Sequence, residues 1–262
     1  MKSFLKKAYT FLIFFFLYAP IVVLIVFSFN SSKSRATWGG FSFKWYEKLF
    51  NDSQILSALY NTLLIALISS VFATIIGTGA AIGISRMRKF PKTLSMNITY
   101  IPVLSPDIVT GISLMLLFIF IKVPLGFLTM LLAHITFNLP FVIISVLPKI
   151  KQLNNQVFDA ALDLGATPMY AYKKVILPEI MPGVLTGFLL AFTLSIDDFV
   201  ISFFTTGSGV SNLAITIYSM ARRGINPEIN ALLTLMFGAI LFLLLLVNYR
   251  MSKDNSKGEK SR

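Results

Sequence analysis

Long, unbroken runs of apolar residues alternate with short polar segments along the chain. Six runs are long enough to cross a bilayer, since a spanning helix needs about 20 mainly apolar residues. They extend approximately over Ala8–Phe29, Leu59–Ile84, Leu94–Ile121, Leu125–Leu147, Gly183–Phe204 and Ala231–Tyr249. The runs are continuous rather than alternating, and lipid requires each segment to satisfy its own backbone hydrogen bonds. The pattern therefore predicts an all-α integral membrane protein with about six transmembrane helices.

The first apolar run follows a basic start, Met1 to Lys7, as in a secretory signal peptide. The run is too long for such a signal, and no clear small-x-small cleavage site follows it. We therefore expect a retained first helix.

The composition agrees with a membrane protein. Of the 262 residues, 56% are hydrophobic and only 13% are charged, whereas soluble domains carry about a quarter charged residues. The absence of cysteine excludes disulfides, zinc thiolate sites, thiolate-held iron–sulfur clusters and a cysteine nucleophile. The net charge is +12, but the basic residues lie between the apolar runs rather than in one patch. We therefore expect the chain to lie in a lipid bilayer and not to bind nucleic acid.

Basic residues are distributed unevenly between the alternate connections. If the N-terminus faces the cytoplasm, 16 of the 23 Lys and Arg residues lie in inner segments and 7 in outer ones. Inner segments of membrane proteins carry the excess of basic residues. This asymmetry predicts that both termini are cytoplasmic.

Two connections are long. The outer one, Asn30–Ser57, carries aromatic residues that either anchor it at the membrane interface or contact a ligand: Trp38, Phe41, Phe43, Trp45, Tyr46 and Phe50. The inner one extends over Pro148–Pro182. The polar tail after Tyr249 is expected to be disordered.

The inner connection is predicted to form two short helices with a break between them. Asn154 or Asn155 would cap the first helix, whose apolar face holds Val157, Ala160, Ala161 and Leu164. Gly165 supplies a left-handed stop. Thr167 and Pro168 begin the second helix, which is expected to end before Pro178. The pair is either a docking element for another protein or an amphipathic hairpin on lipid headgroups.

This connection resembles the EAA signature of ABC importer permeases: Glu-Ala-Ala, three residues, Gly, nine residues, Ile-x-Leu-Pro. Both spacings match, at Ala160, Ala161, Gly165, Leu177 and Pro178, whereas Asp159 replaces the glutamate and Val175 the isoleucine. In the family this loop is the coupling helix that seats in a cleft of the cytoplasmic ATPase. The resemblance implies that role for Asp159 to Gly165.

The resemblance extends from about Leu59 to Tyr249. Residues 105–109 (SPDIV), 134–141 (HITFNLPF) and 194–199 (LSIDDF) are similar to the C-type subunit of the spermidine/putrescine permease branch. The resemblance implies a type I ABC importer permease fold in a bacterial cytoplasmic membrane, and transport by alternating access. The implied partners are a second permease subunit, two ATPase subunits that bind ATP and magnesium, and an extracytoplasmic substrate-binding protein.

The expected division of the chain has three parts. Residues 1–58 hold the first helix and the outer loop, residues 59–250 the permease core with the coupling loop at 148–182, and residues 251–262 the tail. No G-x-x-x-x-G-K-[ST] motif occurs, so ATP would be bound by a partner. We expect this chain to hold no cofactor, no metal and no catalytic residue.

A few polar residues interrupt the apolar runs. A carboxylate in a spanning helix usually faces a cavity or a partner. Adjacent helical positions point about 100° apart, so we expect one of Asp197 and Asp198 to line the substrate pathway and the other to make a structural hydrogen bond. The alternative is a buried polar lock between helices. Asp107, which follows the helix-bending Pro102 and Pro106, either lines the pathway or caps freed amides. His134 either contacts the substrate or takes part in gating, or it is a neutral, hydrogen-bonded packing residue.

Small residues four apart favour close helix packing, within the chain or against a partner. They occur at Gly79 and Gly83 and at Gly183 and Gly187.

Two other functions remain open. An importer for another small solute, such as an anion or an iron chelate, is possible, although the acidic pair and the scarcity of basic intramembrane residues disfavour an anion. A membrane enzyme or assembly factor would need a catalytic constellation, and the single histidine and few intramembrane ionisable residues supply none that is recognisable.

Overall fold

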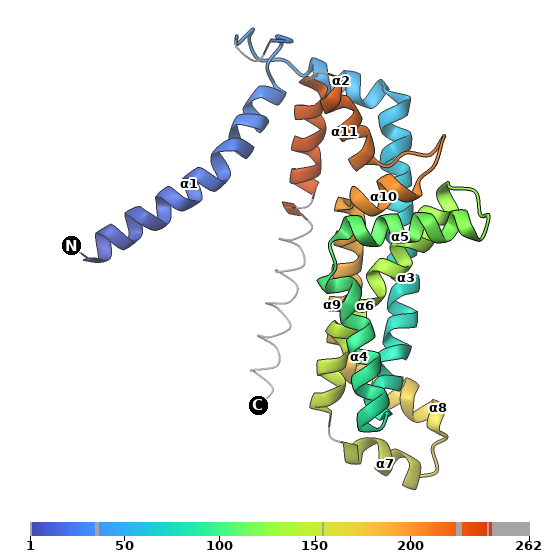
Figure 1. Cartoon of the computed structure of the whole chain (residues 1–262). Helices are drawn as coiled ribbons and strands as arrows, with labels where there is room; N and C mark the ends of the chain where they lie inside the picture. The colour runs from blue at the N-terminus through green and yellow to red at the C-terminus, as the bar shows by residue number, and fades with distance from the viewer. Residues whose placement is uncertain (1, 35–36, 154, 224–226, 240, 243–262) are drawn as a thin grey trace. The chain divides into compact units, whose positions relative to one another are not determined.

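The computed structural model describes residues 2–34, 37–153, 155–223, 227–239 and 241–242, and these are largely helical (Figure 1). Among the described residues two compact units form, one of residues 57–216 and a second that joins the residues before 57 to those after 216. Residues 217–239, which we expected in the permease core, group instead with the N-terminal unit.

The N-terminal unit contains α1 (Lys2–Ser28) and α2 (Lys44–Asn51). The loop between them is organised by Asn30, whose side-chain oxygen accepts from the Gly39 amide at 2.8 Å and whose carbonyl accepts from the Trp45 indole at 2.6 Å. Lys48 forms an ion pair with the buried Glu228 within the same unit. The predicted aromatic cluster is thereby divided, because Trp45 is buried while Trp38 and Phe41 are exposed.

The larger unit is built on three long helices, α3 (Ser53–Arg86), α6 (Phe127–Gln152) and α9 (Leu177–Asp197). Their main apolar core also receives side chains from the short helices α7 (Asn155–Asp163) and α8 (Pro168–Ala171), including Phe158 and Ala171. A second core joins α5 (Asp107–Phe120) and α10 (Val200–Thr205) to α6, through Phe118, Phe137 and Ile201. Helix α11 covers Leu213–Arg222.

Glycine permits the closest helix approaches in this unit. A Cβ on Gly187 would lie 3.2 Å from Cα of Val142 on α6, and one on Gly183 would lie 3.1 Å from the carbonyl oxygen of Ser145. The prediction of close packing is confirmed for this pair, and the packing partner is α6 of the same chain. Gly79 and Gly83 face open space instead, while Gly77, which the sequence pattern did not single out, abuts Val142.

Among the described residues, four helices are long and apolar enough to cross a membrane, and α4 (Lys89–Leu104) with α5 forms one further bent pair. The third predicted run is therefore not one straight helix, since α4 and α5 meet at 106°. The cause is Pro106, which forces Ser105 into an extended conformation (φ −76°, ψ 142°) and lacks a backbone donor. The bend expected from the prolines is confirmed.

The fifth predicted run, which we expected to continue to Phe204, is also broken. Helix α9 ends at Asp197, and Asp198 is extended, with φ −68° and ψ 123°. The Asp198 carboxylate caps the next helix instead, accepting from the amides of Ile201 and Ser202 at 3.1 and 2.7 Å. A local side-chain bond to the backbone thus replaces helix continuation.

The limits of the inner connection also differ from the prediction. Helix α6 continues through Pro148 to Gln152, and the second short helix does not end before Pro178. Helix α8 passes through a π-helical turn, Tyr172–Ile176, directly into α9. The wider turn accommodates the proline, whose missing donor is harmless in the first turn of α9.

The sixth predicted run lies partly outside the described residues. Residues 231–239 and 241–242 are helical, whereas residue 240 and the remainder of the run are not described. Asn154, one of the two predicted caps, also lies outside the described residues, and α7 begins at Asn155. A count of six spanning helices is thus not confirmed.

Candidate functional site

The segment that carries the Asp-Ala-Ala motif forms a helical hairpin, α7 followed by α8, at one end of the larger unit (Figure 1). Gly165 ends α7 with φ +86°. The Gly165 amide donates to the carbonyl of Leu162 at 2.9 Å and the Ala166 amide to that of Ala161 at 3.0 Å. These two bonds define a Schellman stop, which confirms the predicted left-handed glycine.

The start of α8 is also as expected. Thr167 is extended (φ −68°, ψ 151°) and its hydroxyl accepts from the amide of Tyr170, with Pro168 at the beginning of the helix. The hairpin is therefore held by two local caps, one from the glycine and one from the threonine.

The outer face of the α7–α8 hairpin is apolar and uncovered. The large side chains there are Val157, Leu164, Met169 and Tyr170, of which Leu164 is 90% exposed. Ala160 and Gly165 lie exposed between them, and Asp159 is exposed on α7. A shallow depression follows this face and is lined in part by Ala161, Leu164, Gly165 and Tyr170. A surface with small residues at its centre allows close approach by another protein.

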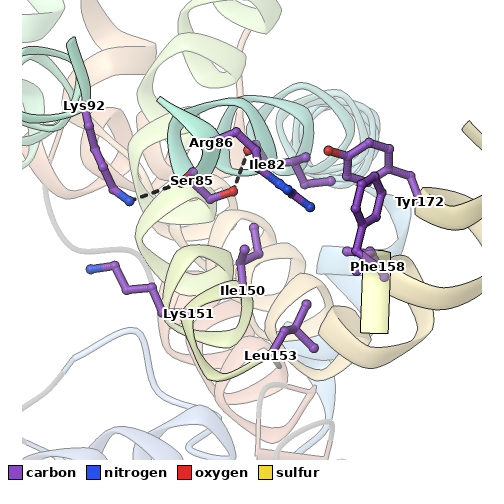
Figure 2. A pocket seen from close by; sticks show the side chains of 10 residues that line it. Ile82, Ser85, Arg86, Lys92, Ile150, Lys151, Leu153, Phe158 and Tyr172 are labelled. Atoms are coloured by element: carbon purple, nitrogen blue, oxygen red, sulfur yellow. Dashed lines mark hydrogen bonds between the residues drawn. The ribbon is translucent and has the colours of Figure 1, made fainter. Parts of the chain in front are cut away.

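The inner face of the hairpin is fixed to the helix bundle through Phe158. Its ring lies 4.4 Å from the guanidinium of Arg86 at the end of α3 and 4.9 Å from the ring of Tyr172 (Figure 2). Leu177 packs against the same core, whereas Pro178 is exposed at the start of α9. Of the predicted coupling residues, Asp159, Ala160, Ala161 and Gly165 therefore lie in the hairpin, and Leu177 and Pro178 lie in the helix that continues it.

The acidic pair lies at the opposite end of α9, about 30 Å away at 1.5 Å per residue over its 21 residues. The two carboxylates differ in their surroundings. Asp197 is exposed, whereas the side chain of Asp198 is only 7% exposed. Asp198 accepts from two backbone amides and from the Ser202 hydroxyl at 2.9 Å.

Ser202 is the centre of a buried polar network that joins α6, α10 and the segment before α11. Its oxygen lies 2.9 Å from Nε2 of His134 and accepts from the Asn212 amide at 2.7 Å. A hydroxyl has one proton to donate, and here it is given to Asp198. Nε2 of His134 must then carry a hydrogen, so this buried histidine donates to Ser202.

A second buried polar cluster ties the three long helices together. The side-chain amide of Asn138 on α6 donates to Oγ of Ser195 on α9 at 2.7 Å, and Ser69 of α3 lies 3.0 Å from the same oxygen. Sequence reasoning did not assign roles to these residues or to Ser202 and Asn212. The available signal was their polarity within otherwise apolar runs.

Asp107 begins α5 directly after the bend and is exposed. The early part of α5 packs closely on α10, since a Cβ on Gly111 would lie 3.0 Å from the Phe204 ring and 3.4 Å from the carbonyl of Val200. The structure thus brings the two broken runs against each other. A carboxylate in the first turn also complements the helix dipole.

Residues 73–253 match the model of the family described as "Binding-protein-dependent transport system inner membrane component". The chain belongs to this family. It is 41% identical to the spermidine/putrescine transport system permease protein PotC of Escherichia coli, over 94% of this chain and 93% of that protein. It is 40% identical to the putrescine transport system permease protein PotI of the same organism, over 92% and 88% of the two chains.

The fold also matches solved transporters. The crystal structure of a bacterial ABC transporter involved in the import of the acidic polysaccharide alginate superimposes with a TM-score of 0.71, at 18% identity, over 95% of each chain. This permease therefore has the type I ABC importer fold that the resemblance implied. It is a multi-pass inner-membrane protein and a transport subunit rather than an enzyme.

Proposed function

We propose that this permease is one half of the membrane pathway of an ATP-driven importer for polyamines, of the spermidine and putrescine type. The observation that carries the proposal is the near full-length identity of 41% and 40% to two permeases named for these solutes. Alternating access exposes the pathway to each side of the membrane in turn.

The complete transporter contains a second, related permease, two ATPase subunits and an extracytoplasmic binding protein. ATP and magnesium are bound by the ATPase subunits, because this chain carries no phosphate-binding loop motif. A surface for such a partner is available on the larger unit, where the outer face of the α7–α8 hairpin is apolar and exposed.

The α7–α8 hairpin is the docking element for the ATPase, and it faces the cytoplasm together with both termini. Phe158 anchors α7 to the helix bundle through Arg86 and Tyr172, while α8 continues into α9 through the π-helical turn. A displacement of the hairpin by the ATPase would therefore act directly on α9. The far end of that helix is Asp197.

Asp197 is the better candidate of the acidic pair for contact with a polyamine cation. It is exposed at the helix break, so its carboxylate is available to replace part of the solvation that a cation loses in a narrow pathway. The Asp198 carboxylate is already occupied by two amides and a hydroxyl. Asp107, exposed at the start of α5, provides a second pathway carboxylate.

Uptake of labelled spermidine, putrescine and an unrelated solute tests the cargo. A strain without this gene, and without other polyamine carriers, should lose polyamine uptake and recover it with the wild-type gene. Asp197→Asn keeps size and hydrogen bonding but removes the charge, so uptake should fall roughly five-fold, as expected for about 1 kcal/mol. Equal polyamine uptake with and without the gene would disprove the proposed cargo.

A further inference from the structure

A small basic cavity lies beside the α7–α8 hairpin, where the ends of several helices meet (Figure 2). Its volume is about 230 Å³. Three cationic side chains line it: Arg86 at the end of α3, Lys92 in the first turn of α4, and Lys151 near the end of α6. None of the ten side chains that line it is acidic. The cavity thus gathers three positive charges from three separate helices.

These cations retain the capacity to bind an anion. Lys92 donates from Nζ to the carbonyl of Ser85 at 3.2 Å, and an ammonium group has three donors. The Arg86 guanidinium stacks on Phe158, which occupies its face and leaves its in-plane donors at the edge. In Figure 2 the ammonium groups of Lys92 and Lys151 lie on one side of the cavity, and the Arg86 guanidinium points toward Phe158 on the other. Like charges that line one cavity repel each other. An anion held between them would remove that repulsion.

We propose that this cavity binds the phosphate group of an anionic membrane lipid. The placement rests on the proposed function, because it requires the hairpin end of the bundle to face the cytoplasm, where the leaflet is anionic. Free phosphate has the same chemistry and is distinguished by the experiment below. The site is not assigned to polyamines, which its charge would repel.

Three features favour a lipid headgroup over an acidic protein segment. The cavity is smaller than the roughly 300–1,000 Å³ typical of sites for whole ligands. Apolar side chains from Ile82, Ile150 and Leu153 complete its wall. Beside Lys92 on α4, Phe90 is 80% exposed and Leu94 is also exposed, as is usual for a helix turn at the level of lipid headgroups. Acyl chains would then extend along this apolar surface.

A bound headgroup would also act on the hairpin. Phe158 of α7 and Tyr172 of the π-helical turn line the cavity together with the three cations. A phosphate that bridges the ends of α3, α4 and α6 would therefore stiffen the platform on which the hairpin rests. We expect anionic lipid to strengthen the link between ATP hydrolysis and transport.

The experiment measures lipid binding to the purified full-length chain in detergent by native mass spectrometry. Phosphatidylglycerol and phosphatidic acid are the anionic probes, phosphatidylcholine is the zwitterionic control, and inorganic phosphate is the competitor. The cavity variant is Arg86→Gln with Lys92→Gln and Lys151→Gln. The matched control, Arg88→Gln with Lys89→Gln and Lys174→Gln, removes an equal number of positive charges. These three positions lie nearby in the sequence or fold but do not line the cavity.

The wild-type chain and the control should prefer the anionic lipids, whereas the cavity variant should lose about 100-fold in affinity, about five-fold for each basic side chain. The double variant Lys92→Gln with Lys151→Gln keeps the stacking of Arg86 on Phe158 and should lose about 25-fold. It provides the test if the triple variant does not fold. If inorganic phosphate displaces the lipids at comparable concentration, the anion site stands and its ligand is the free ion.

Equal loss in the cavity variant and the control, or no loss in either, would overturn the proposal. It would also be overturned if the cavity variant bound lipid normally but no longer co-purified with its ATPase, since the cations would then serve a protein carboxylate. Because lipid binding needs no transported solute, failure of the polyamine assignment would leave this result unchanged.

Discussion

Neighbouring residues of the same type have different roles in this permease, and Asp197 and Asp198 illustrate it. The sequence places both carboxylates in one apolar run, where the expected consequence was two helical positions about 100° apart. The helix ends before Asp198 instead, because the Asp198 carboxylate caps α10 and accepts a hydrogen bond from the Ser202 hydroxyl. Whether a carboxylate caps a helix depends on amide donors three or four residues later in the chain. The spacing of apolar residues alone does not reveal whether these donors are free.

The residue-scale prediction is that Asp198→Asn destabilises the protein and Asp197→Asn does not. Asparagine offers one oxygen where the carboxylate offers two, so an amide or the Ser202 hydroxyl loses its acceptor. Hydrogen bonds to a charged group contribute about 1.5–3 kcal/mol, and we expect a loss of that size. Thermal unfolding of the purified chain provides the measurement, and equal effects of the two substitutions would contradict the capping role.

At the scale of elements, local signals were sufficient where a single residue determines the backbone. Gly165 and the Thr167–Pro168 pair were expected from composition and spacing, and both form as predicted. The continuation of α8 through Pro178 was not expected, because the sequence rule is that proline ends a helix. The π-helical turn at Tyr172–Ile176 is the exception, and Ala171 and Ile176 at its two ends are buried in the core.

The stop at Gly165 gives an element-scale prediction. Valine at φ +86° would be strained by roughly 1–2 kcal/mol, whereas asparagine tolerates this conformation. Gly165→Val should therefore misplace the hairpin and reduce substrate-stimulated ATP hydrolysis in the assembled transporter, with membrane insertion unchanged. Gly165→Asn is the matched control and should retain coupling. Normal coupling in the valine variant would argue against the hairpin as the docking element.

Packing between α3 and α6 gives a second element-scale prediction. A Cβ on Gly77 would lie 2.8 Å from Cβ of Val142, while one on Gly79, two residues later in the same helix, meets nothing within 4 Å. Gly77→Ala should cost about 1–3 kcal/mol through overpacking, and Gly79→Ala should stabilise the helix by about 0.5–1 kcal/mol. Thermal unfolding of the two purified variants should move in opposite directions; a stabilising Gly77→Ala would show that α3 and α6 are packed more loosely.

At the scale of the whole molecule, hydrophobic patterning predicted the all-helical class and most of the spans. It could not predict that residues 217–239 would group with the N-terminal unit, because such grouping depends on contacts distant in sequence, such as the ion pair of Lys48 with Glu228. Residues 9–18 of α1 are exposed to the outside of their unit. An apolar helix surface of this kind suits contact with lipid or with another subunit, and a single sequence contains neither.

The orientation in the membrane is a property of the whole molecule that labelling can decide. The uneven distribution of 16 and 7 basic residues predicts that α2 lies outside and the α7–α8 hairpin inside. Because the chain contains no native cysteine, one introduced cysteine reports on one position. Glu47 on α2 and Gln156 on α7 are both exposed, so accessibility within the protein does not favour either.

In spheroplasts, Glu47→Cys should react with a membrane-impermeant maleimide, and Gln156→Cys should react only after the membrane is permeabilised. The cysteine-free wild-type chain is the control for background labelling. Reaction of Gln156→Cys in intact spheroplasts, with protection of Glu47→Cys, would invert the orientation. An inverted permease would present the hairpin to the side that lacks ATP, so this result would also remove the hairpin as the site of ATPase docking.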